Sequence, residues 1–313
     1  MQLTKQKYQL TGIALVLCGT LLFSTKSIFI KQAYALGIDP VSLMFLRMSM
    51  SVPFYIIIYW YYRGTAIPMS IKELCLVCTT GCIGYYLASY LDLTGLLYIS
   101  ASFERVILYL FPTIVLFLSV IFFKHKIKRF ELLALALSYI GLMVIYFQDV
   151  STQGDQVTLG AVLVFASAIA FAIFVIASGQ LITRVGAIRF TSLSMISASI
   201  AITVHYAISS SQQKIGLYAF QTDVYFLAFI LALFCTVLPS YLINFGIQRI
   251  GAAHSAIIST ISPVFTIILA AIFLNETSTF IHVIGFAFVI GGIGILTFAK
   301  ISPRLNNTAP GKQ

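Results

Sequence analysis

The chain has 313 residues, of which 60% are hydrophobic and 9% charged, and its mean hydropathy is +1.00. A soluble domain of this size could not bury that much apolar surface, so the composition excludes one and predicts an integral membrane protein. The net charge of +10 would allow nucleic-acid binding. The bases lie mostly in short loops between apolar segments, where they set membrane orientation. We therefore expect a lipid bilayer as partner and no nucleic acid.

Apolar segments long enough to cross a bilayer as helices recur along the whole chain. A helix needs about 20 apolar residues for this. We predict an all-α integral membrane protein with ten transmembrane helices, at residues 10–34, 40–62, 71–91, 99–123, 130–147, 159–182, 190–208, 224–245, 252–274 and 279–299.

Lysine and arginine are distributed unevenly between the two sides of these spans. Of the 19 such residues, Lys26, Arg47 and Arg105 lie within spans, Lys31 and Lys214 lie on one side, and the remaining fourteen lie on the side of the N-terminus. Because these residues favour the cytoplasmic side, we predict that both termini are cytoplasmic. Short loops with this orientation fit a multi-pass protein of the bacterial inner (plasma) membrane.

The two halves of the chain match when one is shifted onto the other. A shift of 151 residues pairs Gly95 with Gly246, Pro112 with Pro263 and Gly141 with Gly292, and a shift of 148 pairs Gly12 with Gly160 and Phe23 with Phe171. We predict two repeats of five helices, residues 1–150 and 151–313. An odd number of spans reverses the second copy, which gives the inverted repeats typical of alternating-access transporters.

The fourth span carries two adjacent charges, Glu104 and Arg105. A charge inside hydrocarbon is costly and usually functional. From a helical rise of about 1.5 Å per residue, Lys26, Arg47 and Glu104 lie roughly 12, 10 and 8 Å deep, so they could share one layer. Adjacent helical residues point in different directions. We therefore expect Glu104 and Arg105 to face different neighbours and Glu104 to pair with Lys26 or Arg47.

This charged layer has two interpretations that the residues leave open. A base left unpaired and facing a cavity would favour a substrate with a carboxylate or phosphate, such as an amino acid. The charges could instead form a structural ion-pair network, with Lys26 and Arg47 extending towards the membrane surface. Burial would favour a protonated Glu104, which suits a carrier of a coupling proton, whereas pairing with a base would keep it ionised.

Weaker candidates for a substrate pathway lie outside this layer. Tyr86 and Tyr90, four residues apart on one helix face, could line a pocket, although tyrosine also anchors spans at the membrane surface. Asn244 is a polar group of the second repeat. His254 is either part of the pathway or a hydrogen-bonded packing histidine.

The second repeat replaces the charges of the first. Lys26, Arg47 and Glu104 correspond to Phe174, Met195 and Ser255. We therefore expect a site that is polar from one half and apolar from the other. Pro112 and Pro263 each remove a backbone hydrogen bond, so they predict fixed kinks in the fourth and ninth spans.

A family resemblance rests on a pattern that occurs twice. A helix rich in small residues, a central proline, a polar turn and a glycine-bearing helix follow one another at 100–141 and at 252–292. This pattern resembles the two EamA repeats of the drug/metabolite transporter superfamily. The Asn275–Glu276 turn is similar to the family's Gly-Glu turn, whereas Lys124–His125 stands there in the first repeat. The stretch 98–113, YISASFERVILYLFPT, resembles a bacterial subgroup.

The resemblance implies a ten-helix secondary transporter, with amino acids, nucleotide sugars, nucleosides, drugs or other metabolites as substrates. Two rivals are a lipid-modifying membrane enzyme and a receptor that binds without transport. The chain has no HExxH pattern, which argues against the enzyme, and it has no P-loop with which to use ATP.

Cys75, Cys78 and Cys82 share a helix face, but without nearby histidines we expect packing residues, no metal and no cofactor.

Overall fold

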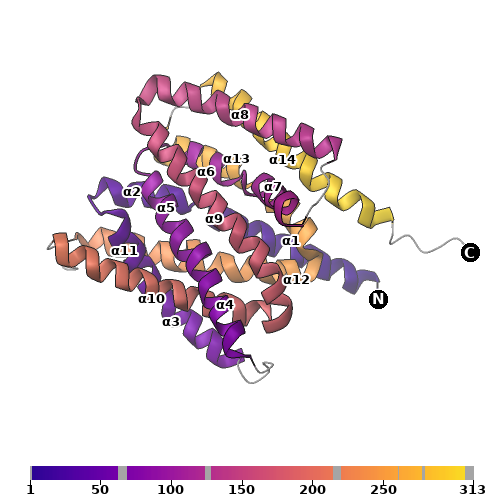
Figure 1. Cartoon of the computed structure of the whole chain (residues 1–313), viewed down its shortest axis with the longest axis horizontal. Helices are drawn as coiled ribbons and strands as arrows, with labels where there is room; N and C mark the ends of the chain where they lie inside the picture. Colours follow the sequence, from indigo (N-terminus) through magenta and orange to yellow (C-terminus); the bar gives the residue numbers. More distant parts are fainter. Residues whose placement is uncertain are drawn as a thin grey trace, which may run out of the picture.

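Figure 1 shows a computed structural model of the chain, which describes residues 2–62, 69–123, 128–213, 220–259, 261–276 and 279–306. These ranges are helical and contain no strand, which confirms the all-α prediction. The elements are α1 (Gln2–Ser24), α2 (Lys26–Ala35), α3 (Pro40–Tyr62), α4 (Ile71–Gly81), η2 (Cys82–Leu87), α5 (Ala88–Gly95), α6 (Ala101–Leu108), α7 (Phe111–Phe123), α8 (Arg129–Gln153), α9 (Gln156–Val185), α10 (Ala187–Gln213), α11 (Thr222–Ala232), η4 (Leu233–Val237), α12 (Leu238–Ser259), α13 (Ser262–Phe273) and α14 (Phe280–Asn306).

Within the described residues, eight helical segments are long and apolar enough to cross a membrane. They are Leu10–Ala35, Pro40–Tyr62, Ile71–Gly95, Ala101–Leu118, Arg129–Ser151, Gln156–Gly179, Ala187–Ser210 and Thr222–Ile243. These segments match the first eight predicted spans. The last two predicted spans correspond to shorter apolar helices, Ser262–Phe273 and Phe280–Ile295. Large apolar side chains such as Trp60, which is 68% exposed, cover the outside, as expected where lipid is the solvent. The chain is a multi-pass membrane protein.

The structure differs from our prediction between the eighth and ninth spans. We expected a loop near 246–251, but α12 continues to Ser259. In the first half a new helix, α6, starts at the matching place, because the Ser100 hydroxyl caps it by accepting a hydrogen bond from the Phe103 amide at 3.1 Å. The residue 151 positions later is Gly251, which has no side chain to act as such a cap.

Several spans are interrupted inside the bundle. The first span breaks at Thr25, between α1 and α2, and the Thr25 hydroxyl donates to the Leu22 carbonyl at 2.7 Å. The third and eighth spans contain the π-helices η2 and η4. A shift of 151 residues moves η2 onto 233–238, which is η4 plus one residue. π-helical turns often mark functional sites.

Glycines let helices of the two halves approach closely. A Cβ atom built on Gly95 of α5 would lie 2.8 Å from the Gly160 carbonyl oxygen of α9. A Cβ atom built on Gly246 of α12 would lie 3.1 Å from the Gly12 carbonyl oxygen of α1. The shift of 148 residues takes Gly12 to Gly160, and the shift of 151 takes Gly95 to Gly246, so each pair corresponds to the other. The α1–α12 contact therefore has its counterpart in the α5–α9 contact.

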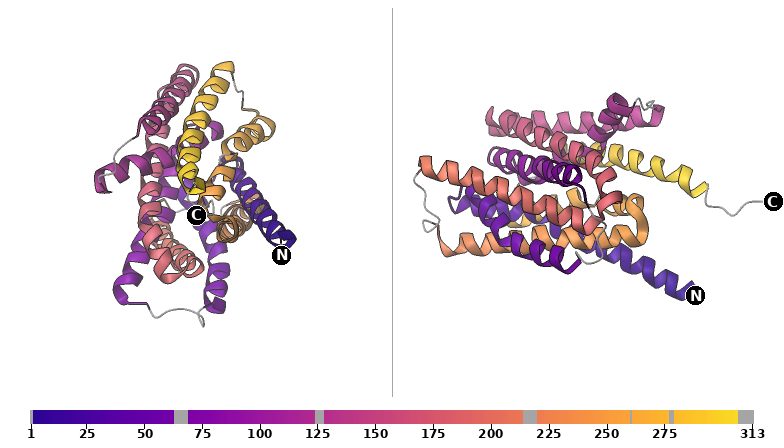
Figure 2. Two further views of the ribbon diagram at one scale, coloured as in Figure 1. Left: turned by 90° about the vertical axis from the view of Figure 1, so that its right-hand side faces the viewer. Right: turned by 60° about the horizontal axis from the view of Figure 1, so that its bottom comes forward.

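The other main helix pairs also join the two halves. α8 and α14 lie side by side along one edge of the bundle, and α3 packs on α10 at the opposite edge (Figures 1 and 2). Between these edges lie α2, α6 and α13, which contact one another. Three of the predicted charged residues, Lys26, Glu104 and Arg105, lie on α2 and α6.

Candidate functional site

Two helices start inside the bundle and carry most of the charges. Lys26 is the first residue of α2, and Glu104 and Arg105 lie in the eight-residue α6. All three side chains are buried. The partial positive charge of a helix N-terminus stabilises an ionised carboxylate in the first turn of α6, where Glu104 lies.

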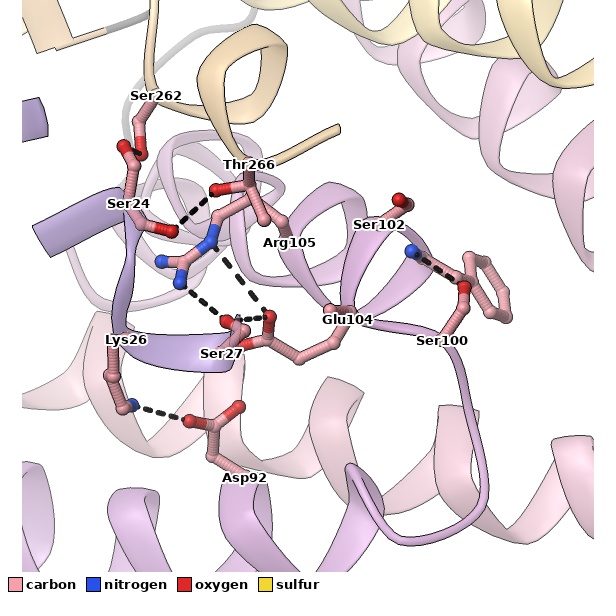
Figure 3. Close-up of polar contacts among 12 residues, drawn as sticks. Ser24, Lys26, Ser27, Asp92, Ser100, Ser102, Glu104, Arg105, Ser262 and Thr266 are labelled. Carbon is pink, nitrogen blue, oxygen red and sulfur yellow. Dashed lines mark hydrogen bonds and ion pairs between the residues drawn. The ribbon is translucent and has the colours of Figure 1, made fainter. Parts of the chain in front are cut away.

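Lys26 pairs with Asp92, an acid outside the predicted spans. Lys26 Nζ donates to Asp92 Oδ2 at 2.6 Å, and both side chains are buried (Figure 3). The predicted third span ended at residue 91, which left Asp92 just outside it. In the structure α5 continues to Gly95, so Asp92 faces the bundle interior. The prediction that Glu104 pairs with Lys26 or Arg47 is therefore wrong, since Lys26 binds Asp92 and the base beside Glu104 is Arg105.

Glu104 and Arg105 meet at one neighbour, Ser27 of α2. The Ser27 hydroxyl donates to Glu104 Oε2 at 2.7 Å and accepts a hydrogen bond from Arg105 Nη2 at 2.6 Å (Figure 3). Arg105 Nε lies 3.8 Å from Glu104 Oε2. Our expectation that the two residues face different neighbours was wrong, because the long arginine side chain bends back to the serine that Glu104 binds.

Arg47 adds a third buried base. It lies on α3, it is 3% exposed, and its Nε has no hydrogen-bond partner in the described part of the chain. Asp92 lies close enough to interact with it electrostatically. With Lys26 and Arg105 it forms three bases against two acids, which leaves one net positive charge when both acids are ionised. We call these five residues, Lys26, Arg47, Asp92, Glu104 and Arg105, the charge cluster.

The second half of the chain contributes hydroxyl groups beside the charge cluster. Ser24 and Ser262 are hydrogen-bonded through their hydroxyls at 2.7 Å, and the Thr266 hydroxyl donates to the Ser24 carbonyl at 3.0 Å (Figure 3). The Tyr109 hydroxyl of the first half donates to the Ser259 carbonyl. We had expected the second half to be apolar at this place. It contributes no charge to the cluster, but it does contribute these hydroxyl groups.

Tyr86 and Tyr90 contact His205, which was not among the residues predicted for the site. The Tyr86 hydroxyl lies 3.1 Å from His205 Nδ1, and the Tyr90 ring centroid lies 4.9 Å from that of His205. His205 belongs to α10, so these rings join the third and seventh spans. A lone histidine inside an apolar span was the signal that could have indicated it.

A cavity of about 370 Å³ lies at the predicted outer end of the bundle. Its walls include Lys31, Tyr98, Ser100, Ser102, Asp149, Asn275, Glu276 and His282. Glu276 follows α13 and accepts hydrogen bonds from the Ala101 amide at 2.7 Å and from the Ser102 amide at 3.1 Å and hydroxyl at 2.8 Å. A carboxylate of the second half thus caps α6, the helix that carries Glu104 and Arg105.

The same cavity contains a buried histidine–carboxylate pair. His282 Nε2 lies 2.7 Å from Asp149 Oδ1, and His282 Nδ1 accepts a hydrogen bond from the Thr279 amide at 3.1 Å. With Nδ1 as acceptor, the ring proton sits on Nε2 and is donated to Asp149. This pair joins the end of α8 to the start of α14.

The remaining candidates are the two prolines and several residues whose side chains the structure does not describe. Pro112 is the second residue of α7 and Pro263 the second of α13, so each stands in the first turn of a helix, where proline costs no hydrogen bond. The side chains of Asn244, His254 and Ser255 lie outside the described part of the structure. So do Lys124 and His125.

Comparison with known proteins assigns the family. The model of the EamA-like transporter family matches residues 10–147 and 158–298. The uncharacterized transporter YcbK of Bacillus subtilis (strain 168) is 30% identical over 276 residues, 88% of each chain. The uncharacterized transporter YetK of the same strain is 26% identical over 222 residues, 70% of this chain and 67% of its own. A solved crystal structure with 15% identity and a TM-score of 0.63 covers 97% of this chain and 99% of its own, which shows a shared fold. The resemblance inferred from the sequence is confirmed: the chain belongs to the EamA-like transporter family.

Proposed function

We propose that this protein is a secondary transporter that moves an amino acid or related carboxylate across the bacterial plasma membrane by alternating access. The charge cluster is the observation that carries the proposal. Five buried charges between membrane-spanning helices are costly, and such groups commonly mark substrate and ion pathways. Because bases outnumber acids by one, the cluster favours a substrate with a negative group.

The proposal includes a topology of ten spans in two inverted repeats, residues 1–150 and 151–313, with both termini in the cytoplasm. The ninth span would combine the last turns of α12 with α13, and α14 would be the tenth. The relation between the Gly95–Gly160 and Gly12–Gly246 contacts supports this arrangement, since a two-fold axis between the halves exchanges such pairs. The matching π-helices support it as well.

Alternating access requires that one end of the bundle close while the other opens. At the predicted outer end, the three hydrogen bonds of Glu276 hold α6 against the turn after α13. We propose that this cap closes the outer path to the charge cluster and breaks when that path opens. The His282–Asp149 pair is a second contact across the same cavity.

Within the cluster, the substrate carboxylate would bind Arg47, whose Nε has no hydrogen-bond partner among the described residues. A carboxylate accepts hydrogen bonds from an arginine in a fixed, paired geometry. A proton is the proposed coupling ion, with Glu104 as the acid that carries it.

Substrate counterflow tests this proposal. Proteoliposomes preloaded with a mixed pool of amino acids are offered each labelled amino acid in turn, beside empty liposomes. We expect transient accumulation of one class, and loss of that accumulation in Arg47→Met. If no amino acid accumulates but nucleosides or drugs do, the proposed substrate class is wrong. Ligand binding without exchange of any compound would identify a receptor instead.

A further inference from the structure

Among the described residues, two buried oxygen atoms of the charge cluster have no hydrogen-bond donor. Asp92 Oδ2 accepts from Lys26 and Glu104 Oε2 accepts from Ser27. The other oxygens, Asp92 Oδ1 and Glu104 Oε1, have no partner among the described residues. Both residues are at most 2% exposed. An unsatisfied acceptor away from water is destabilising, and a charged one more so.

These two carboxyl groups face each other. Figure 3 shows Asp92 and Glu104 turned towards one another from α5 and α6, and the two carboxyl groups interact electrostatically. Two ionised carboxylates offer only acceptors and repel each other. One proton would remove both problems, because it supplies the missing donor and cancels one negative charge.

We propose that Asp92 and Glu104 share one proton, held between Asp92 Oδ1 and Glu104 Oε1, and that this acid pair is the proton site of the transporter. The inference rests on the proposed function and names Asp92 as a second member of the site. Glu104 then carries the coupling proton together with Asp92. The proton moves between the pair and water when the path to the cluster opens, with no other bond made or broken.

The surroundings of the acid pair link its proton to the substrate. The charged and titratable groups that interact with the pair are Lys26, Lys31, Tyr34, Arg47 and Arg105. With the shared proton present, the charge cluster carries two net positive charges instead of one. A bound anion offsets this excess, so the anion and the proton stabilise each other's binding, and the effect is reciprocal. The protein is therefore expected to carry both in the same direction.

Infrared spectroscopy of the purified protein, without substrate, tests the shared proton directly. We expect wild type to show the carbonyl stretch of a protonated carboxylic acid, shifted in heavy water. The band should vanish in Asp92→Asn and also in Glu104→Gln. Asp39→Asn is the matched control. Asp39 accepts hydrogen bonds from the Val41 and Ser42 amides, both at 3.0 Å, and lies outside the cluster, so its replacement should leave the band unchanged.

A band that survives in Asp92→Asn would assign the proton to Glu104 alone and overturn the proposal, as would its absence from wild type. Each amide substitution keeps a donor for the facing oxygen, so both variants should fold. If Asp92→Asn aggregates because Lys26 has lost its partner, the double variant Lys26→Met/Asp92→Asn is measured, and a surviving band overturns the proposal equally. The assay involves no transport. A failure of the counterflow experiment would therefore leave a confirmed acid pair standing.

Discussion

The two halves of this protein place opposite chemistry at related positions. In the first half, Lys26 and Arg47 belong to the buried charge cluster. Their counterparts, Phe174 and Met195, are buried among apolar side chains. The Phe174 ring centroid lies 4.8 Å from that of Tyr85 and 5.9 Å from that of Phe190. One helical framework therefore supports a network of charges in one half and an aromatic cluster in the other.

The difference shows how each region is stabilised. In the charge cluster a side chain depends on a specific partner, because an unpaired buried charge is strongly destabilising. In the aromatic cluster a side chain depends on shape, because its loss leaves a cavity. Replacing both partners of an ion pair should therefore restore stability in the charge cluster. In the aromatic cluster, stability should depend only on side-chain volume.

The largest effect is expected from Lys26→Met. It leaves the Asp92 carboxylate buried without its ion-pair partner, which typically costs about 3–5 kcal/mol. We expect a much lower thermal midpoint in detergent and no counterflow. Adding Asp92→Asn should restore most of the midpoint but not the counterflow. If the double variant is no more stable than the single one, the pairing is not what stabilises this region.

The exposed ion pair between Arg184 and Glu73 provides the matched control for that experiment. Their closest atoms lie 3.4 Å apart, but the Arg184 side chain is 72% exposed. Solvent-exposed pairs contribute little to stability. Arg184→Met should leave both the midpoint and counterflow unchanged within error.

Phe174→Ala tests the aromatic counterpart. Removing a buried phenylalanine side chain costs about 3–5 kcal/mol through lost contacts and the cavity that remains. Phe174→Leu, which keeps most of the volume, should recover the greater part of the thermal midpoint. Equal losses for leucine and alanine would show that ring stacking, rather than volume, stabilises this region.

The glycine contacts between the halves should give intermediate effects. Gly95→Ala places a methyl group against the Gly160 backbone, and overpacking of this kind costs about 1–3 kcal/mol. Gly246→Ala should lower the thermal midpoint too, because its added methyl group meets Val16. Gly179→Ala is the control, since a methyl group there meets no described residue within 4 Å. The close packing would be contradicted if Gly179→Ala lowered the thermal midpoint while Gly95→Ala and Gly246→Ala left it unchanged.

The smallest effect is expected from Glu276→Gln. The amide keeps the shape of the cap on α6, but it has one acceptor oxygen instead of two and no negative charge, so it loses the bond from either the Ala101 or the Ser102 amide, a cost of about 1–2 kcal/mol. We expect a modest fall in thermal midpoint. If the cap closes the outer path, Ser100→Cys combined with Glu276→Gln should react faster with a thiol reagent than Ser100→Cys alone. Asp155→Asn is the control, because Asp155 stands at the start of α9 without a side-chain capping bond.

Asp92 was not predicted to be a buried residue, because the end of its helix was predicted too early. The predicted third span ended at Leu91, but the helix continues to Gly95, where the Thr94 hydroxyl donates to the Tyr90 carbonyl at 2.7 Å. An error of one helical turn therefore left a buried acid outside the predicted span. Glu276 was assigned to a turn correctly, but its bonds to α6 come from residues some 175 positions away.

The sequence by itself determined the membrane class, the family and the spans that carry charge. These conclusions rest on local hydrophobicity, on the spacing of prolines and glycines, and on the rarity of charges in apolar segments. Only the tertiary structure decided which charges pair. Lys26 meets Asp92, and Glu104 meets Ser27, because the helices break at Thr25 and restart after Ser100 inside the bundle. These breaks reorient the side chains, and nothing in the local sequence records which helix will lie opposite.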